Sequence, residues 1–170
     1  MASAALAEIE TGRTQRGGKY LVFHLGNEEF GVHVLKVREI MGLQDITPVP
    51  QTPHHVKGVL NLRGKVVPVI DLRAKFGLEE KAYTQRTCIV VLQVARRSES
   101  LMIGAIVDGV SEVLNLQEGE VEDTPSFGGS ATVPYILGLA KVKGKVKILL
   151  DIDKALTVDE IAPMTDFPLE

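Results

Sequence analysis

The sequence predicts an all-β fold: two packed five-stranded barrels with short helical turns. From Tyr20 to Leu156 the chain consists of short runs rich in Val, Leu and Ile, interrupted by Gly, Pro and Asn. This pattern is typical of short strands joined by turns. The same stretch contains an internal repeat, which indicates two similar units. Small sheets of this size commonly curl into barrels, because a closed barrel leaves no strand edge exposed.

The composition limits the class of protein. The 170 residues suffice for one compact domain or two very small ones. Nineteen basic and 22 acidic residues give a net charge of −3, whereas nucleic-acid-binding proteins more often carry a basic excess. A general nucleic-acid or anionic-membrane surface is therefore not favoured.

No part of the sequence indicates secretion or membrane insertion. The first residues lack the basic start and apolar run of a secretion signal. The purely apolar runs are much shorter than the ~20 residues needed to cross a bilayer. The single cysteine, Cys88, cannot form an internal disulfide. We therefore expect a cytoplasmic protein without direct membrane insertion.

The repeat divides the expected body of the chain, residues 19–156, into copies at about 20–77 and 88–156. Residues 1–18 are expected to be a flexible leader and residues 157–170 a mobile tail. Residues of the first copy recur 73 positions later and then 80 positions later, which places an insertion near residues 125–129. Chance similarity among Val- and Gly-rich strands is the alternative. The pairs include Val37 and Val110, Glu39 and Glu112, Ile40 and Val113, Gly58 and Gly138, Arg63 and Lys143, Val66 and Val146, and Asp71 and Asp151.

Each copy is expected to contain a hairpin followed by a short helical turn. The hairpins are centred on Arg63-Gly64 and Lys143-Gly144, where glycine can supply the positive φ of a tight turn. Asp71 and Asp151 are placed to cap the helical turns, because a carboxylate there can accept from unpaired backbone N–H groups.

Two segments are harder to assign. Residues 30–41 also fit one face of a helix, but their β-branched content favours a bent strand. Pro68 removes a hydrogen-bond donor from residues 65–70, so this strand is expected to lie at a sheet edge or to carry a bulge at the proline.

The sequence does not carry the motifs of an enzyme. It has no glycine-rich nucleotide loop and no Gly-x-Ser-x-Gly elbow. The adjacent His54 and His55 point to opposite faces of an extended segment, which is poor geometry for a shared metal. Cys88 opens an apolar run, where a small buried side chain is the simpler explanation. We expect no catalytic residues, no metal and no cofactor.

The segment from Lys141 to Lys147 carries four lysines at alternate positions of a hairpin, so they are expected to share one face. Such a face is usually only solvated. A small-barrel nucleic-acid binder is the alternative, but the aromatic residues on which bases stack are missing.

Glu39 and Arg63 are charged residues within apolar surroundings. If the two side chains meet, they form a partly shielded ion pair. The simple interpretation is a surface salt bridge of little energetic consequence. The functional one is a polar contact within an apolar docking groove, which selects partners more than it adds stability. The sequence leaves both open.

Three collinear motifs resemble the CheW family of bacterial chemotaxis coupling proteins. They are FGVHVLKVREI at residues 30–40, GVLNLRGKVVPVIDL at residues 58–72, and VDGVSEVL at residues 107–114. The resemblance extends over about residues 19–156, nearly the whole expected body of the chain.

The resemblance implies a non-enzymatic adaptor of two SH3-like barrels that joins the histidine kinase CheA to methyl-accepting chemoreceptors in signalling arrays. It implies that a receptor hairpin docks in a groove between the barrels, and that the kinase's CheW-like domain contacts them through Phe127 and the nearby Glu122. An adaptor of another chemosensory system, serving pilus motility or development, is an alternative. The groove positions that match the family are Val37, Glu39, Ile40, Gly58, Arg63, Gly104 and Val110.

Overall fold

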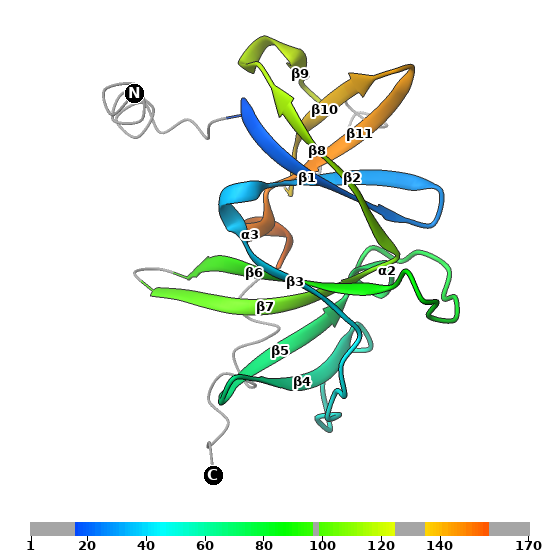
Figure 1. Cartoon of the computed structure of the whole chain (residues 1–170), viewed down its shortest axis with the longest axis vertical. Coiled ribbons are helices and arrows are strands. Elements are labelled where there is room, and N and C mark those ends of the chain that lie inside the picture. The colour runs from blue at the N-terminus through cyan, green and yellow to red at the C-terminus, as the bar shows by residue number, and fades with distance from the viewer. Residues whose placement is uncertain (1–15, 97–98, 125–134, 157–170) are drawn as a thin grey trace.

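A computed structural model describes residues 16–96, 99–124 and 135–156. These residues form mainly β-strands in two sheets, one of six strands and one of five. Figure 1 shows the six-stranded sheet above the five-stranded sheet, with α3 lying between them. The predicted all-β fold with short helical turns is confirmed.

In both sheets the order of the strands differs from their order in the sequence. The six-stranded sheet has the order β8-β1-β2-β11-β10-β9, and the five-stranded sheet has the order β3-β6-β7-β5-β4. Short helical segments separate some strands. The elements are β1 (Gly18–Leu25), β2 (Glu28–His33), η1 (Val34–Lys36), β3 (Val37–Gly42), β4 (Val56–Leu62), β5 (Lys65–Asp71), α2 (Leu72–Lys75), β6 (Cys88–Arg96), β7 (Glu99–Val107), β8 (Gly109–Leu116), η2 (Glu118–Glu120), β9 (Val121–Glu122), β10 (Ile136–Val142), β11 (Lys145–Leu150) and α3 (Ile152–Ala155).

The sheets exchange strands between the two halves of the chain. The early strands β1 and β2 pair with the late strands β8 and β11, whereas β6 and β7 pair with β3 and β5. Each sheet contains one parallel contact, β2 with β11 or β7 with β5. Neither sheet therefore consists of one continuous half of the chain.

Three apolar cores hold this arrangement together. The largest lies between the sheets and includes Phe23 of β1, Leu72 of α2 and Ile103 of β7. A second core belongs to the five-stranded sheet and a third to the six-stranded sheet. Along β6, Val90 and Leu92 enter the shared core, while Ile89 and Val91 enter the second core. Because successive side chains of a strand point to opposite faces, one strand supplies two cores.

The two hairpin turns form as predicted. Leu62 pairs with Lys65, and Val142 pairs with Lys145, so each loop has two residues. Arg63 has a φ of 50° and Gly64 a φ of 85°, and the second turn repeats these values closely. Positive φ at both central residues is the conformation that matches the twist of a two-residue hairpin.

The predicted helix caps are confirmed only in part. Asp71 occupies the N-cap of α2, and its carboxylate accepts a hydrogen bond from the backbone N–H of Arg73 at 3.0 Å. Asp151 occupies the N-cap of α3, but its side chain makes no capping hydrogen bond.

The prediction of one bent strand at residues 30–41 is wrong. The segment forms β2 and β3, separated by the 3-10 turn η1. The two strands belong to different sheets, so the turn carries the chain from one sheet to the other. The apolar spacing that also fits a helix reflects this break.

The prediction for Pro68 is also wrong, because β5 is an interior strand, and the register shift in its pairing with β4 lies between Val56 and Gly58 of β4. Pro68 is opposite Val59, whose N–H and C=O both bond to Thr47. This cross-strand pair therefore requires no N–H from the proline. Pairing between β5 and β7 begins only at Val69.

Two ion pairs connect the helices with the segments that cross between sheets. The guanidinium of Arg73 in α2 lies 2.5 Å from the carboxylate of Asp108, which also accepts from the N–H of Gly26. The ammonium of Lys36 in η1 lies 2.8 Å from the carboxylate of Asp153 in α3. Arg73 and Asp153 are each the second residue of their helix. In the first pair the helix supplies the cation and the crossing segment supplies the carboxylate, and in the second pair these roles are reversed.

The four lysines at residues 141–147 do not form one solvated face, contrary to the prediction. The side chain of Lys147 is only 5% exposed, and its ammonium lies 2.6 Å from the carboxylate of Glu29. Lys141, by contrast, is exposed and lies 3.6 Å from Glu122. The parallel pairing of β11 with β2 sets Lys147 opposite Glu29, a contact between residues far apart in the chain.

We expect the Glu29–Lys147 pair to make stability depend on pH. The hydrogen bond from Lys147 holds the pKa of Glu29 below its usual value. A lowered pKa in the folded state stabilises the protein above the ordinary carboxyl pKa, and this contribution is lost as pH falls through the folded-state pKa. Urea unfolding should show that Glu29→Gln destabilises the protein clearly at neutral pH and much less in the acid range.

The matched control is Glu28→Gln. Glu28 is an exposed residue of the same strand and pairs with no cation in the described part of the chain, so its substitution should change stability little. A Glu29→Gln effect of equal size at both pH values would contradict the assigned role of the charge.

Candidate partner-docking site

The predicted contact between Glu39 and Arg63 is present. Arg63 in the β4–β5 turn lies 2.7 Å from one carboxylate oxygen of Glu39 in β3, and its second terminal nitrogen lies 3.4 Å from the other oxygen. The hydrogen bond with Glu39 raises the pKa of Arg63. The side chain of Arg63 is 71% exposed and that of Glu39 is 30% exposed. The pair is thus fixed in geometry but accessible from solvent.

Ile40, the next residue, is an exposed apolar side chain at 46% exposure. It lies opposite Val90 of β6, whereas Glu39 lies opposite Val91. Opposed residues share a face of an antiparallel pair, so Glu39 and Ile40 point to opposite faces of β3. Ile40 shares its face with a residue of the core between the sheets, and Glu39 shares its face with a residue of the second core.

Val37 and Val110 lie on different sheets. Val37 begins β3, and Val110 follows the start of β8. Both are half-buried and pack against the core between the sheets. Val110 also lines a cavity of about 370 Å³ together with His24 and Arg86. The two valines therefore border the same core from opposite sheets.

The two glycines of the predicted site are buried. Gly58 has a φ of +139°, and a Cβ atom there would lie 2.0 Å from the carbonyl oxygen of Thr47. A Cβ atom on Gly104 would lie 3.0 Å from Ile89. Both positions allow close packing behind the surface, so any effect on docking would act through the shape of the five-stranded sheet.

Of the two predicted kinase-contact residues, the structure describes Glu122. Glu122 lies in β9 with an exposed side chain, near the ammonium of Lys141. Phe127 lies outside the described residues.

Sequence reasoning did not assign several exposed apolar residues to a site. Val66 and Val146 occupy corresponding positions of the two hairpins, each directly after a lysine, and Val113 is the repeat counterpart of Ile40. The sequence feature that could have indicated these residues is an apolar side chain beside charged neighbours that recurs in both copies of the repeat. Leu35 in η1 is 89% exposed and has no such counterpart among the exposed apolar residues described.

The other side chains that the sequence offers for metal binding or catalysis are paired or partly buried within the protein. His54 pairs with Glu80. Burial raises the pKa of the Cys88 thiol. Within the described ranges, no group of three or more His, Cys, Asp or Glu side chains is arranged to hold a metal ion. No helix in those ranges has the length and apolar character to span a bilayer.

Comparisons with known proteins identify the family. Residues 19–160 match the CheW-like domain. The chain is 40% identical to chemotaxis protein CheW of Klebsiella aerogenes over 162 residues, which cover 95% of both chains. It is 30% identical to protein FrzA of Myxococcus xanthus, covering 81% of this chain and 84% of that protein. The crystal structure of the scaffolding protein TtCheW from Thermoanaerobacter tengcongensis matches with a TM-score of 0.74 and 30% identity, covering 85% of this chain and 96% of that one.

The fold thus belongs to a class of small, non-enzymatic β scaffolds. The chain belongs to the CheW family, and it is a chemotaxis scaffold of that family.

We expect Gly58→Ala to destabilise the protein by at least about 2 kcal/mol, because it combines a positive φ with a clash against the Thr47 carbonyl. Gly42→Ala is the matched control: Gly42 lies in the neighbouring β3, and a Cβ atom there would meet nothing within 4 Å. Urea unfolding of both variants measures the difference. Equal stability of the two variants would contradict the packing role of Gly58.

Proposed function

We propose that this scaffold couples methyl-accepting chemoreceptors to the histidine kinase CheA in arrays on the cytoplasmic side of the membrane. Family membership supports this proposal, since its relatives include proteins named for chemotaxis. The identity to the Klebsiella chemotaxis protein, 40%, exceeds the 30% identity to FrzA. This difference favours chemotaxis over another sensory system.

The Glu39–Arg63 pair carries the assignment of the receptor-docking surface. An exposed pair adds little stability, but a bidentate guanidinium–carboxylate contact has a defined geometry. Ile40 presents apolar area on the other face of the same strand. A helical hairpin placed along β3 would bury apolar area while the ion pair fixes its register. Val37 and Val110 would extend this surface along the core between the sheets, with Gly58 and Gly104 shaping it from behind.

We assign the kinase contact to the outer edge of the six-stranded sheet. Glu122 lies in β9, the outer strand of the six-stranded sheet, and Phe127 follows it in sequence. The kinase contact at β9 would then be separate from the Glu39–Arg63 pair on β3 and the β4–β5 turn, which allows one adaptor to hold both partners.

The overall function is tested by capture of the regulatory CheW-like domain of CheA on the immobilised protein, followed by addition of a receptor fragment. We expect the kinase domain to bind and the receptor fragment to join the complex without displacing it. Failure of the kinase domain to bind at micromolar concentrations would contradict the proposed function.

The docking surface is tested by Arg63→Ala and Glu39→Ala. We expect each to weaken receptor binding by about three- to tenfold while the kinase domain still binds, since charges at the rim of an interface have effects of this size. Fluorescence anisotropy with a labelled receptor fragment measures the change, and melting curves check the fold.

The control for these variants is Lys143→Ala, because Lys143 occupies the same turn position in the six-stranded sheet and no ion pair links it to Glu112 among the described residues. It should leave receptor binding unchanged. An equal loss in all three variants would refute the assigned surface, whereas loss of cooperative melting in Arg63→Ala would show that the ion pair is structural.

A further inference from the structure

Three adjoining cavities form a groove that involves both sheets. The first, of about 270 Å³, is lined by residues that include Lys57, Arg73, Lys81 and Tyr83. The second, of about 190 Å³, shares Arg73 and Lys81 with the first. The third, of about 370 Å³, shares His24 and Arg86 with the second. We call these three cavities together the basic groove.

The acidic side chains of the basic groove are already bound within the protein. Asp71 accepts from the N–H of Arg73 and, at 2.8 Å, from the hydroxyl of Tyr83. Asp108 accepts from the guanidinium of Arg73 and from the N–H of Gly26. Glu80 pairs with His54. These contacts occupy carboxylate oxygens with internal donors, and only Asp108 is paired with a permanent cation. The lining as a whole has one more cation than carboxylates, with Lys57, Arg73, Lys81 and Arg86 against Asp71, Glu80 and Asp108.

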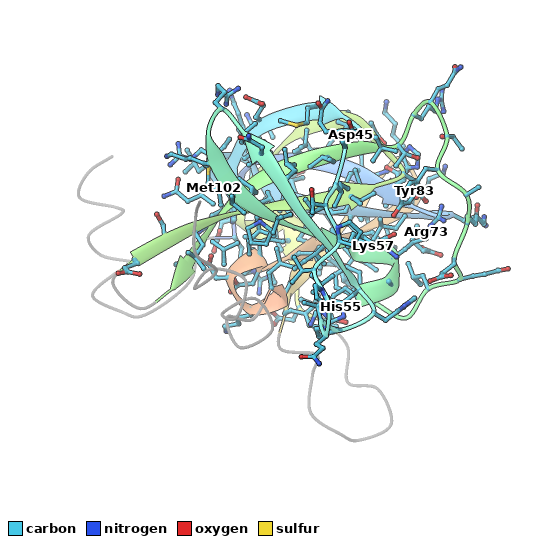
Figure 2. All side chains as sticks on the ribbon, turned by 90° about the horizontal axis from the view of Figure 1, so that it is seen from below. Asp45, His55, Lys57, Arg73, Tyr83 and Met102 are labelled. Carbon is cyan, nitrogen blue, oxygen red and sulfur yellow. The ribbon has the colours of Figure 1, made fainter. Side chains whose placement is uncertain are left out.

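Lys57, Lys81 and Arg86 have no such partner. None of the three forms an ion pair with a carboxylate in the described ranges, and Lys81 and Arg86 are exposed. The labelled Lys57, Arg73 and Tyr83 lie close together in Figure 2, at the side away from Met102. The whole chain has a net charge of −3, so this local excess of cations does not follow from overall composition. Concave surfaces concentrate such a field.

The arrangement of these cations fits an extended acidic peptide better than a small anion. A single phosphate group could contact the cations of one cavity, but the unpaired cations are distributed over all three. The ring of Tyr83, 44% exposed, adds an apolar contact beside them. We propose that the basic groove binds an acidic peptide segment of a partner protein.

The basic groove adjoins the proposed receptor-docking surface without coinciding with it. Its third cavity contains Val110, but none of the three cavities includes Glu39 or Arg63. The proposal does not rest on the assigned partners, because it follows from the charges of the isolated chain. Its failure would leave the scaffold function untouched.

The test is titration of the full-length, isotopically labelled protein with an octaglutamate peptide, followed by two-dimensional NMR. We expect shifts confined to the backbone amides around Lys57, Arg73, residues 81–87 and residues 108–111. Octaglutamine should cause no such shifts. Inorganic phosphate should bind at least about tenfold more weakly, since it can meet fewer cations at once. Phosphate binding as tight as the peptide would overturn the assignment of a peptide ligand.

The decisive variant replaces Lys57, Lys81 and Arg86 by glutamate, and its spectrum first shows whether the fold is kept. The single variant Arg86→Glu, at an exposed loop position, serves if the triple variant does not fold. The control replaces the exposed Lys19, Lys143 and Lys154 by glutamate, which makes the same change in net charge outside the groove. We expect at least about a tenfold loss of peptide affinity in the triple groove variant and only a small loss in the control. Equal losses, or shifts spread over all surface lysines, would overturn the proposal.

Discussion

The apolar core between the two sheets is the constraint on which the rest of the structure depends. It receives residues from β1 and β2 on one side and from β6 and β7 on the other, and the helices α2 and α3 contribute Leu72 and Ile152. Because β6 also supplies the second core, a shift of this strand that removed its residues from one core would also disturb the other core. The exchange of strands between the halves of the chain strengthens this connection, since neither sheet is complete without both halves.

This construction suits a scaffold, which has to present surfaces to several partners in a fixed relation. The proposed receptor surface lies on β3 and the β4–β5 turn, the proposed kinase contact lies on β9, and the basic groove involves both sheets. The ion pairs Arg73–Asp108 and Lys36–Asp153 join the helices to the crossing segments on which this relation depends. A scaffold transmits a signal only if its contacts differ between the active and inactive assemblies.

Much of the local structure was predictable from the sequence. The hairpins at Arg63-Gly64 and Lys143-Gly144 depend on short-range backbone preferences, and the cap at Asp71 depends on its immediate neighbours. The contact between Glu39 and Arg63 was predictable as a possibility, because both are charges in apolar surroundings. The motif resemblance then pointed to the family.

Features that depend on distant pairing were not predictable. The burial of Lys147 requires Glu29 on a parallel neighbour, and Pro68 is tolerated because Val59 bonds to Thr47 on its other side. The turn at residues 34–36 becomes evident only when β2 and β3 are seen in different sheets. The basic groove requires residues from several elements, and no local pattern shows which carboxylates are already bound. In each case the determining partner lies far away in the chain.

The central claim, that the two sheets form one cooperative unit, is tested most directly by unfolding with a probe in each sheet. The chain has no tryptophan, so Val66→Trp and Val146→Trp place one reporter at equivalent exposed positions of the five-stranded and six-stranded sheets. Guanidinium unfolding of each variant is followed by tryptophan fluorescence and by circular dichroism. A shared core with exchanged strands predicts that both signals change in a single transition with the same midpoint in each variant. A fluorescence transition that separates from the circular dichroism transition, early for one sheet and late for the other, would contradict the claim.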